Sequence, residues 1–87
     1  MPNTIVVSSF DCPFSEFEAI VTKVDKEQGY VFCSELEIVK VNEHKAMILM
    51  NCSDLEKFGS MLEQPKLKKW DMDNNCVDTV YNLELIQ

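Results

Sequence analysis

The chain has 87 residues, and its eight lysines and fifteen carboxylates, with no arginine, give a net charge of −7. This length fits one small domain, which we expect to span residues 1–87. An acidic surface repels nucleic acid and anionic lipid, and without arginine the chain lacks the guanidinium fork that contacts phosphate and guanine bidentately. Composition therefore excludes nucleic acid as an expected partner.

The apolar segments and the cysteines set further limits. No stretch approaches the roughly 18 apolar residues of a membrane span, so no membrane partner is expected. The four cysteines include no C-x-x-C pair, and a single histidine accompanies them, so we expect no metal site and no cofactor. A cytoplasmic protein with reduced thiols fits this pattern.

A strand and a helix are predicted first. Thr4–Phe10 is rich in β-branched residues, which is typical of a strand. Proline is favoured in the first turn of a helix, so Pro13 begins a predicted helix that reaches about Gln28. Its apolar residues recur at helical spacing: Phe14, Phe17, Val21 and Val24. Gly29 is then expected to end the helix as a C′ glycine.

A β-hairpin is predicted next. Tyr30–Val41 is extended, with an alternating pattern at Leu36–Ile38, and Asn42–Lys45 forms a polar turn. The following segment, Lys45–Asn51, is predicted to be a buried strand that is apolar on both faces.

The last third of the chain predicts a second helix, a short helical extension and a strand. Ser53–Glu56 has the sequence of a capping box, in which the serine and glutamate side chains satisfy backbone amides of the first turn. Pro65 interrupts this helix, and one or two further turns run to about Asn74. Apolar and polar residues alternate from Val77 to Leu85, which predicts a strand with one buried face.

The order β-α-β-β-α-β predicts an α+β fold of the ferredoxin-like type. We expect a four-stranded antiparallel sheet in the order 4-1-3-2, with both helices on one face. The first and third strands are expected to lie in the centre and to run parallel, because of right-handed crossover connections.

Two central strands that are apolar on both faces leave one face of the sheet without a cover. A two-layer domain with one wet face would alternate apolar and polar residues along these strands. We therefore expect a homodimer through the open sheet face, since soluble monomers rarely expose a large apolar patch. Two alternative sets of residues fit that dimer face: Val6, Phe10, Met47 and Leu49, or the opposite set Ile5, Val7, Ile48 and Met50. The alternative is a monomer with a modest patch, or with a long loop folded across it.

The element order, the apolar central strands and three segments resemble the dimeric α/β-barrel superfamily, in particular its small uncharacterised members. The segments are Cys12–Phe17, Ser53–Glu56 and Leu62–Trp70. The resemblance implies a dimeric barrel with a pocket between the sheet and its helices. The superfamily includes cofactor-free monooxygenases, haem-degrading enzymes, muconolactone isomerases and stress-responsive barrel proteins. His44 falls in the predicted hairpin turn, which departs from the haem-degrading pattern, and no catalytic motif matches, so no catalytic residue is carried over.

A pocket under the helices would be lined by aromatic and sulfur-containing residues. The candidates are Phe14, Phe17, Phe58, Met61 and Trp70, with Tyr30, Asn51 and Tyr81 giving polar contacts. Simple core packing is the alternative for the same residues.

Cys12 and Cys52 each follow a central strand and precede a helix. We expect both at the same edge of the sheet, near helix N-termini, which lower the pKa of a thiol. The hypothesis is a nearby pair of reactive thiols, and the alternative is two small buried side chains. Cys33 and Cys76 are expected at the opposite edge, too far apart to pair.

These features predict a small homodimeric protein that binds a small apolar ligand between sheet and helices or serves as an assembly module. Two alternatives remain open. One is a cofactor-independent monooxygenase or isomerase of the same superfamily. The other is an adaptor that binds a partner along a free edge strand.

Overall fold

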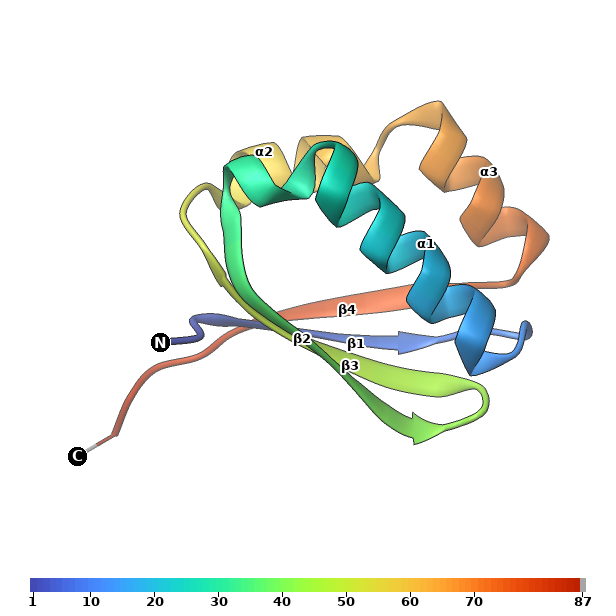
Figure 1. Cartoon of the computed structure of the whole chain (residues 1–87), viewed down its shortest axis with the longest axis horizontal. Coiled ribbons are helices and arrows are strands. Elements are labelled where there is room, and N and C mark those ends of the chain that lie inside the picture. The colour runs from blue at the N-terminus through green and yellow to red at the C-terminus, as the bar shows by residue number, and fades with distance from the viewer. Residues whose placement is uncertain (87) are drawn as a thin grey trace.

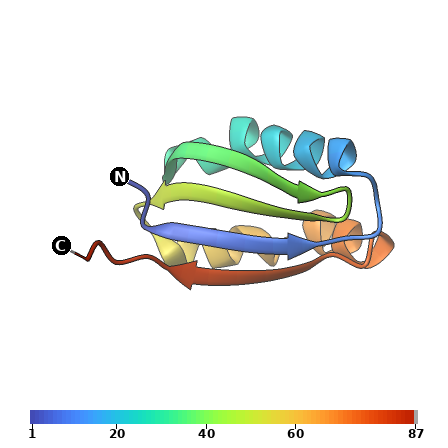
Figure 2. The same cartoon turned by 90° about the horizontal axis from the view of Figure 1, so that it is seen from below.

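Three α-helices lie on one face of a four-stranded sheet in the computed structural model, which describes residues 1–86 (Figure 1). The elements in chain order are β1 (Thr4–Ser9), α1 (Phe14–Glu27), the 3₁₀ turn η1 (Gly29–Val31), β2 (Cys33–Asn42), β3 (Lys45–Cys52), α2 (Leu55–Leu62), α3 (Pro65–Asp73) and β4 (Val77–Asn82). Seen from below, the sheet lies in front of the helices, so its second face is open (Figure 2). The fold is therefore α+β, with the helix layer on one side only. Within residues 1–86, no helix is long and apolar enough to cross a membrane.

The sheet has the order β2-β3-β1-β4, and every neighbouring pair is antiparallel. Read from the β4 edge, this is the predicted order 4-1-3-2. The expectation that β1 and β3 run parallel is wrong, because the two strands pair antiparallel. The connections explain the error: α1 carries the chain back so that β2 runs parallel to β1 without touching it. The β2–β3 hairpin then reverses the direction, and β3 enters between them.

The strand register determines which residues share a face. Directly opposed residues of an antiparallel pair lie on the same face of a sheet. Ile5 lies opposite Leu49, and Val7 lies opposite Met47, whereas Val6 lies opposite Ile48. The residues on the open face of the two central strands are therefore Ile5, Val7, Met47 and Leu49, all partly exposed.

Both predicted sets of dimer-face residues are wrong as sets. The first combined Val6 and Phe10 with Met47 and Leu49, and the second combined Ile5 and Val7 with Ile48 and Met50. Each set took one strand from the open face and the other strand from the buried face, because the register between the strands was not predictable from their alternation alone. Val6, Phe10, Ile48 and Met50 are in fact buried in the core.

The core lies between the helices and the sheet. Its buried side chains include Val6, Ile48 and Met50 of the central strands and Phe17, Phe58 and Met61 of the helices. Phe10, just after β1, stacks on Phe17 of α1, with ring centroids 4.4 Å apart and an interplanar angle of 8°. Burying one side chain of this size stabilises the fold by about 1.5–3 kcal/mol, so this contact fixes α1 over the end of β1.

The N-terminus of α2 differs from the predicted capping box. The N-cap is Asp54, whose carboxylate accepts a hydrogen bond of 3.0 Å from the amide of Lys57. Ser53 instead extends the pairing of the hairpin, because its amide donates to the carbonyl of Phe32 at 2.8 Å. The helix is therefore capped one residue later than predicted.

Gly29 also acts differently from the prediction. No glycine has a positive φ, so Gly29 is not a left-handed C′ residue. It begins η1 and packs closely on α1: a Cβ at this position would lie 3.2 Å from the carboxylate of Asp25. The glycine here allows a close approach, and a larger residue would require the Asp25 side chain to shift by a few tenths of an ångström.

β4 is exposed along its whole length, which corrects the prediction of a half-buried strand. Val80 lies opposite Val6 on the helix side but is 43% exposed, and Tyr81 lies opposite Ile5 on the open side and is 51% exposed. Neither face of this edge strand is fully covered within a single chain. The alternation of apolar and polar residues along β4 is therefore not accompanied by alternating burial within one copy of the protein.

Candidate functional site

A cavity of about 90 Å³ lies between the helices and the sheet. Apolar side chains of all three helices and of the central strands form most of its wall. Four of the predicted pocket residues are among them: Phe17, Phe58, Met61 and Trp70. A cavity with an apolar wall in this position is the usual form of a small-molecule site in a two-layer fold.

The other predicted pocket residues lie elsewhere. Tyr30 is 64% exposed on η1. Asn51 and Tyr81 lie on the open face of the sheet, because Asn51 alternates with buried Met50 and Tyr81 lies opposite Ile5. Phe14 packs against the edge of the core, with the Lys40 ammonium 5.6 Å from its ring centroid.

A Schellman motif at the end of α3 brings Cys76 back to Asp71. Asn75 has a left-handed backbone with φ of 47°. The amide of Cys76 donates to the carbonyl of Asp71 at 2.8 Å, and the amide of Asn75 donates to the carbonyl of Met72 at 3.4 Å. Asparagine tolerates this backbone better than most residues, so the chain reverses sharply and enters β4 with Cys76 beside α3.

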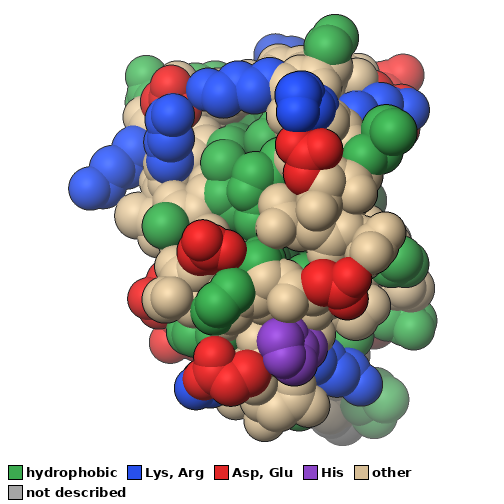
Figure 3. All heavy atoms as spheres, turned by 90° about the vertical axis from the view of Figure 1, so that its right-hand side faces the viewer, with side chains coloured by type: hydrophobic (Ala, Val, Ile, Leu, Met, Phe, Trp, Pro, Cys, Tyr) green, Lys and Arg blue, Asp and Glu red, His purple; other side chains and the backbone are tan. Residues whose placement is uncertain are grey.

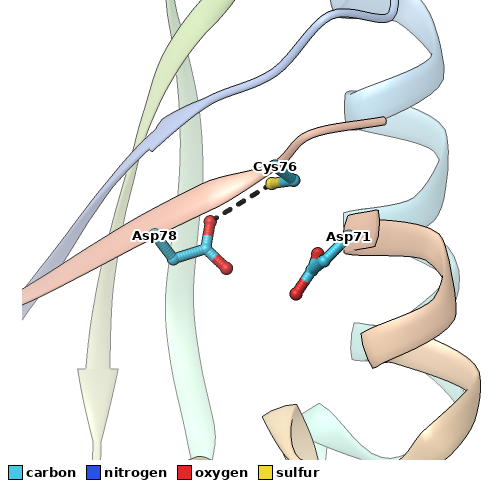
Figure 4. A group of neighbouring side chains, drawn as sticks. All are labelled: Asp71, Cys76 and Asp78. Carbon is cyan, nitrogen blue, oxygen red and sulfur yellow. Dashed lines mark hydrogen bonds between the residues drawn. The ribbon is translucent and has the colours of Figure 1, made fainter. Parts of the chain in front are cut away.

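Four polar side chains meet at this end of the cavity, and three of them are drawn in Figure 4. Asp71 comes from α3, Cys76 immediately precedes β4, and Asp78 lies on β4. The Sγ atom of Cys76 and one carboxylate oxygen of each aspartate lie within 4.8 Å of one another. The thiol of Cys76 donates to Oδ1 of Asp78 at 3.5 Å. The buried hydroxyl of Ser8 on β1 donates to the same oxygen at 2.6 Å. Asp71 faces this group across the cavity end (Figure 4).

Burial and mutual repulsion set the protonation of this group. Burial raises the pKa of Asp71, and the nearby carboxylate of Asp78 raises it further. Burial, followed by the charges of Asp78 and Asp71, also raises the pKa of the Cys76 thiol. Cys76 therefore stays protonated at neutral pH and serves as a hydrogen-bond donor, not as a nucleophile.

The three side chains in Figure 4 are also of the types that bind metal. Zinc binds carboxylates and thiolates. The raised pKa of Cys76 means that a metal would have to displace the thiol proton. A protonated amine or another hydrogen-bond donor needs no such step, so the chemistry of the cluster favours a donor group over a metal ion.

The periodicity, the turn signals and the cysteine spacing of the sequence do not predict this cluster. Asp71, Cys76 and Asp78 lie close together in the chain, but on two elements and the turn between them. The one local signal is the Asn74-Asn75 pair, which favours a turn. Where that turn places the side chains depends on how α3 packs over β1 and β4.

The predicted pair of Cys12 and Cys52 is wrong. β1 and β3 run antiparallel, so Cys12 after β1 and Cys52 at the end of β3 lie at opposite ends of the sheet. Both are buried, and burial, with the charge of Glu16, raises the pKa of Cys12 despite its place near the start of α1. Cys52 instead lies directly opposite Cys33.

His44 lies in the hairpin turn, as predicted, and is exposed. Its Nδ1 atom is 3.2 Å from the carbonyl oxygen of Cys12. The backbone amide of His44 donates a hydrogen bond to Oδ1 of Asn42 at 2.8 Å, within the turn. The contact of Nδ1 with Cys12 joins the hairpin to the β1–α1 loop.

A groove lies outside the cavity, between α1 and α3. At this end of the molecule hydrophobic side chains form a recess with lysines along its upper rim (Figure 3). Ile20 and Trp70 line both the groove and the inner cavity. These two side chains therefore form the boundary between the cavity and the groove. The ring of Trp70 packs on Phe17, with centroids 6.4 Å apart.

The fold and the site define a small α+β protein with an open antiparallel sheet and a cavity between the sheet and its helices. No protein-family model matches the chain, and no curated protein matches it. Among solved structures, the chain is similar to the crystal structure of protein SO0527 from Shewanella oneidensis. The TM-score is 0.51, with 13% sequence identity, over 94% of this chain and 91% of that chain. At this identity the likeness shows the fold alone.

Proposed function

We propose that this protein is a ferredoxin-like homodimer of the dimeric α/β-barrel type that binds a small molecule in the cavity under its helices. The observation that carries the proposal is the lining of the site: a mostly apolar wall with Asp71 and Asp78 at one end and a third carboxylate, Asp25, beside Gly29. Sites of this kind bind a ligand by its apolar body and orient it by a few polar contacts.

The acidic end of the cavity determines the preferred ligand. Oδ1 of Asp78 already accepts hydrogen bonds from Ser8 and Cys76, whereas burial and the charge of Asp78 raise the pKa of Asp71 and so disfavour its charged form. A ligand with an ammonium group supplies a compensating positive charge. We therefore propose a ligand with an apolar body and a cationic end.

Cavity size favours a short aliphatic body. The volume of about 90 Å³ is smaller than the roughly 150 Å³ of an engineered cavity that admits benzene. A branched amine such as isobutylamine is closer to this size than an aromatic amine. Movement of Ile20 and Trp70, which separate the cavity from the groove, provides the entry route.

Titration with three ligands of matched shape tests the proposal. Isobutylamine, isobutanol and isobutyrate share a branched body and differ in the charge of their polar end. We expect saturable NMR shifts of cavity methyl groups, including that of Met61, with affinity highest for the amine and lowest for the acid. Asp71→Asn should weaken binding of the amine at least about tenfold, which is about 1.4 kcal/mol, and leave the alcohol unchanged.

The matched control is Asp73→Asn, which removes the same charge from the exposed side of α3. It should leave the affinity for isobutylamine unchanged. The proposal is wrong if none of the three ligands gives saturable shifts, or if Asp71→Asn and Asp73→Asn weaken the amine equally.

The open face of the sheet supports the homodimeric part of the proposal. Its centre is apolar and its edges add further apolar side chains: Ile5, Val7, Val39, Met47, Leu49, Val77 and Tyr81. Packing this face against the same face of a second copy would cover the patch and the exposed open side of β4.

A further inference from the structure

Cys33 and Cys52 are direct cross-strand neighbours. Cys33 begins β2, Cys52 ends β3, and the two lie opposite each other in the antiparallel register. The next pair outward is hydrogen bonded, since the amide of Ser53 donates to the carbonyl of Phe32 at 2.8 Å. Hydrogen-bonded and non-hydrogen-bonded pairs alternate, so Cys33 and Cys52 form a non-hydrogen-bonded pair, in which the Cα atoms are closest, at about 4.5 Å.

This arrangement matches the geometry that a disulfide requires. Disulfides join residues whose Cα atoms are roughly 4.4–6.8 Å apart. Both thiols are buried on the helix side of the sheet, where Cys33 is 6% and Cys52 is 4% exposed. Burial and the adjacent Cys52 thiol raise the pKa of Cys33 to about 12, so the Cys33 thiol is protonated at neutral pH.

The same end of the sheet has an irregular backbone. Glu35 has a left-handed backbone with φ of 54°, and the register shifts between Ser34 and Glu37. These two features interrupt the ladder just inside Cys33. On the outer side lies η1, where Tyr30 and Val31 are exposed. Access of a small disulfide to the pair requires the first residues of β2 to separate from β3, which breaks the hydrogen bonds that the carbonyl of Phe32 accepts from the amide and the hydroxyl of Ser53.

We propose that Cys33 and Cys52 form a reversible intrachain disulfide by exchange with a low-molecular-weight disulfide such as oxidised glutathione. One cysteine loses its proton, and its thiolate attacks a sulfur of the glutathione disulfide, forming a mixed disulfide and releasing one glutathione thiolate. The thiolate of the second cysteine then attacks the protein sulfur and releases the other glutathione. Two protein thiols are oxidised to one disulfide, and the oxidant is reduced to two glutathione molecules, which take up the two protons.

The modification is independent of the proposed ligand, because it needs only the cross-strand pair. It also has a consequence for the cavity. Cys33 lines the cavity wall, so the disulfide would fix the β2–β3 end of the wall and oppose its opening.

Peptide mapping of the full-length protein after treatment with oxidised glutathione tests the proposal. We expect the intact mass to fall by two hydrogen atoms, a linked peptide that joins Cys33 to Cys52, and recovery of the starting mass with dithiothreitol. The Cys12→Ser/Cys76→Ser double variant should give the same result. Cys33→Ser should stop at a single glutathione adduct on Cys52.

Protein unfolded in urea serves as the reference, because it should give mixed pairings of all four cysteines. A native protein that accumulates only glutathione adducts, or whose linked peptide contains Cys12 or Cys76, would overturn the proposal. So would a native protein that stays reduced under conditions in which the unfolded protein is fully oxidised. The wild-type map alone decides the outcome if a variant does not fold.

Discussion

The hydroxyl of Ser8 donates a hydrogen bond of 2.6 Å to Oδ1 of Asp78, a residue 70 positions later in the chain. Ser8 is buried on β1, and Asp78 lies opposite it on the edge strand β4. The contact therefore joins the first strand to the last and holds one oxygen of the acidic end of the cavity in place. Hydrogen bonds to charged groups are among the stronger ones in proteins.

Ser8→Ala should lower the free energy of unfolding by about 1.5–3 kcal/mol, the usual range for a hydrogen bond to a charged group. Urea denaturation measures this value. The control is Ser9→Ala at the exposed neighbouring position, which should change the stability by less than about 0.5 kcal/mol. Equal effects of the two substitutions would show that the bond to Asp78 contributes nothing.

Asp71→Asn should stabilise the protein at neutral pH. Because the folded state raises the pKa of Asp71 above 3.8, its protonated form is favoured in the folded state. The stability from this group is fully present below pH 3.8 and is lost as the pH rises through the folded pKa. The gain from Asp71→Asn should therefore be largest near pH 7, at less than about 1 kcal/mol because water screens the charge, and should shrink toward pH 4.

Thermal or urea unfolding of both proteins across this pH range measures the difference. Asp73→Asn is the control, since it removes only an exposed ion pair with Lys69 at 2.7 Å. Its effect should stay near zero at every pH. A gain from Asp71→Asn that grows toward low pH would contradict the assignment.

Gly59→Ala should raise the free energy of unfolding by about 0.5–1 kcal/mol, because glycine inside a helix costs conformational entropy. Gly59 lies inside α2, and a Cβ there meets no atom within 4 Å. Gly29→Ala is the matched comparison and should stabilise less than Gly59→Ala, since its Cβ would lie 3.2 Å from a carboxylate oxygen of Asp25, which must shift. The pair of substitutions separates propensity from packing in one urea series.

Leu49→Lys should weaken the proposed homodimer at least about tenfold, which is about 1.4 kcal/mol. Leu49 lies in the centre of the open sheet face, opposite Ile5, and a buried lysine without a partner is costly. Thr22→Lys adds the same charge at an exposed site on α1 and should leave the association unchanged. Sedimentation velocity over a range of protein concentrations gives both dissociation constants.

Local sequence patterns predicted most elements correctly. Pro13 and Pro65 mark the beginnings of α1 and α3 within one residue, because proline favours the first helical turn regardless of tertiary context. The polar turn before Lys45 likewise marks the hairpin. Where two local solutions compete, the prediction fails: Asp54 caps α2 because pairing with Phe32 occupies Ser53.

Properties that depend on the relation between elements were not predictable in this way. The alternation of Ile5, Val6 and Val7 shows that β1 has two apolar faces but not which face meets the helices. That assignment needs the register of Val6 against Ile48. Cys52 was misplaced for a different reason, because β3 runs antiparallel to β1 and not parallel to it. The cluster of Asp71 with Asp78 depends on the Schellman turn at Asn75.

Native mass spectrometry of the freshly purified protein tests the central claim most directly, because one spectrum reports both the number of subunits and any retained small molecule. We expect a species with the mass of two chains, and additional mass from small molecules held under the helices. Single chains at the bare sequence mass, at every protein concentration, would contradict this claim.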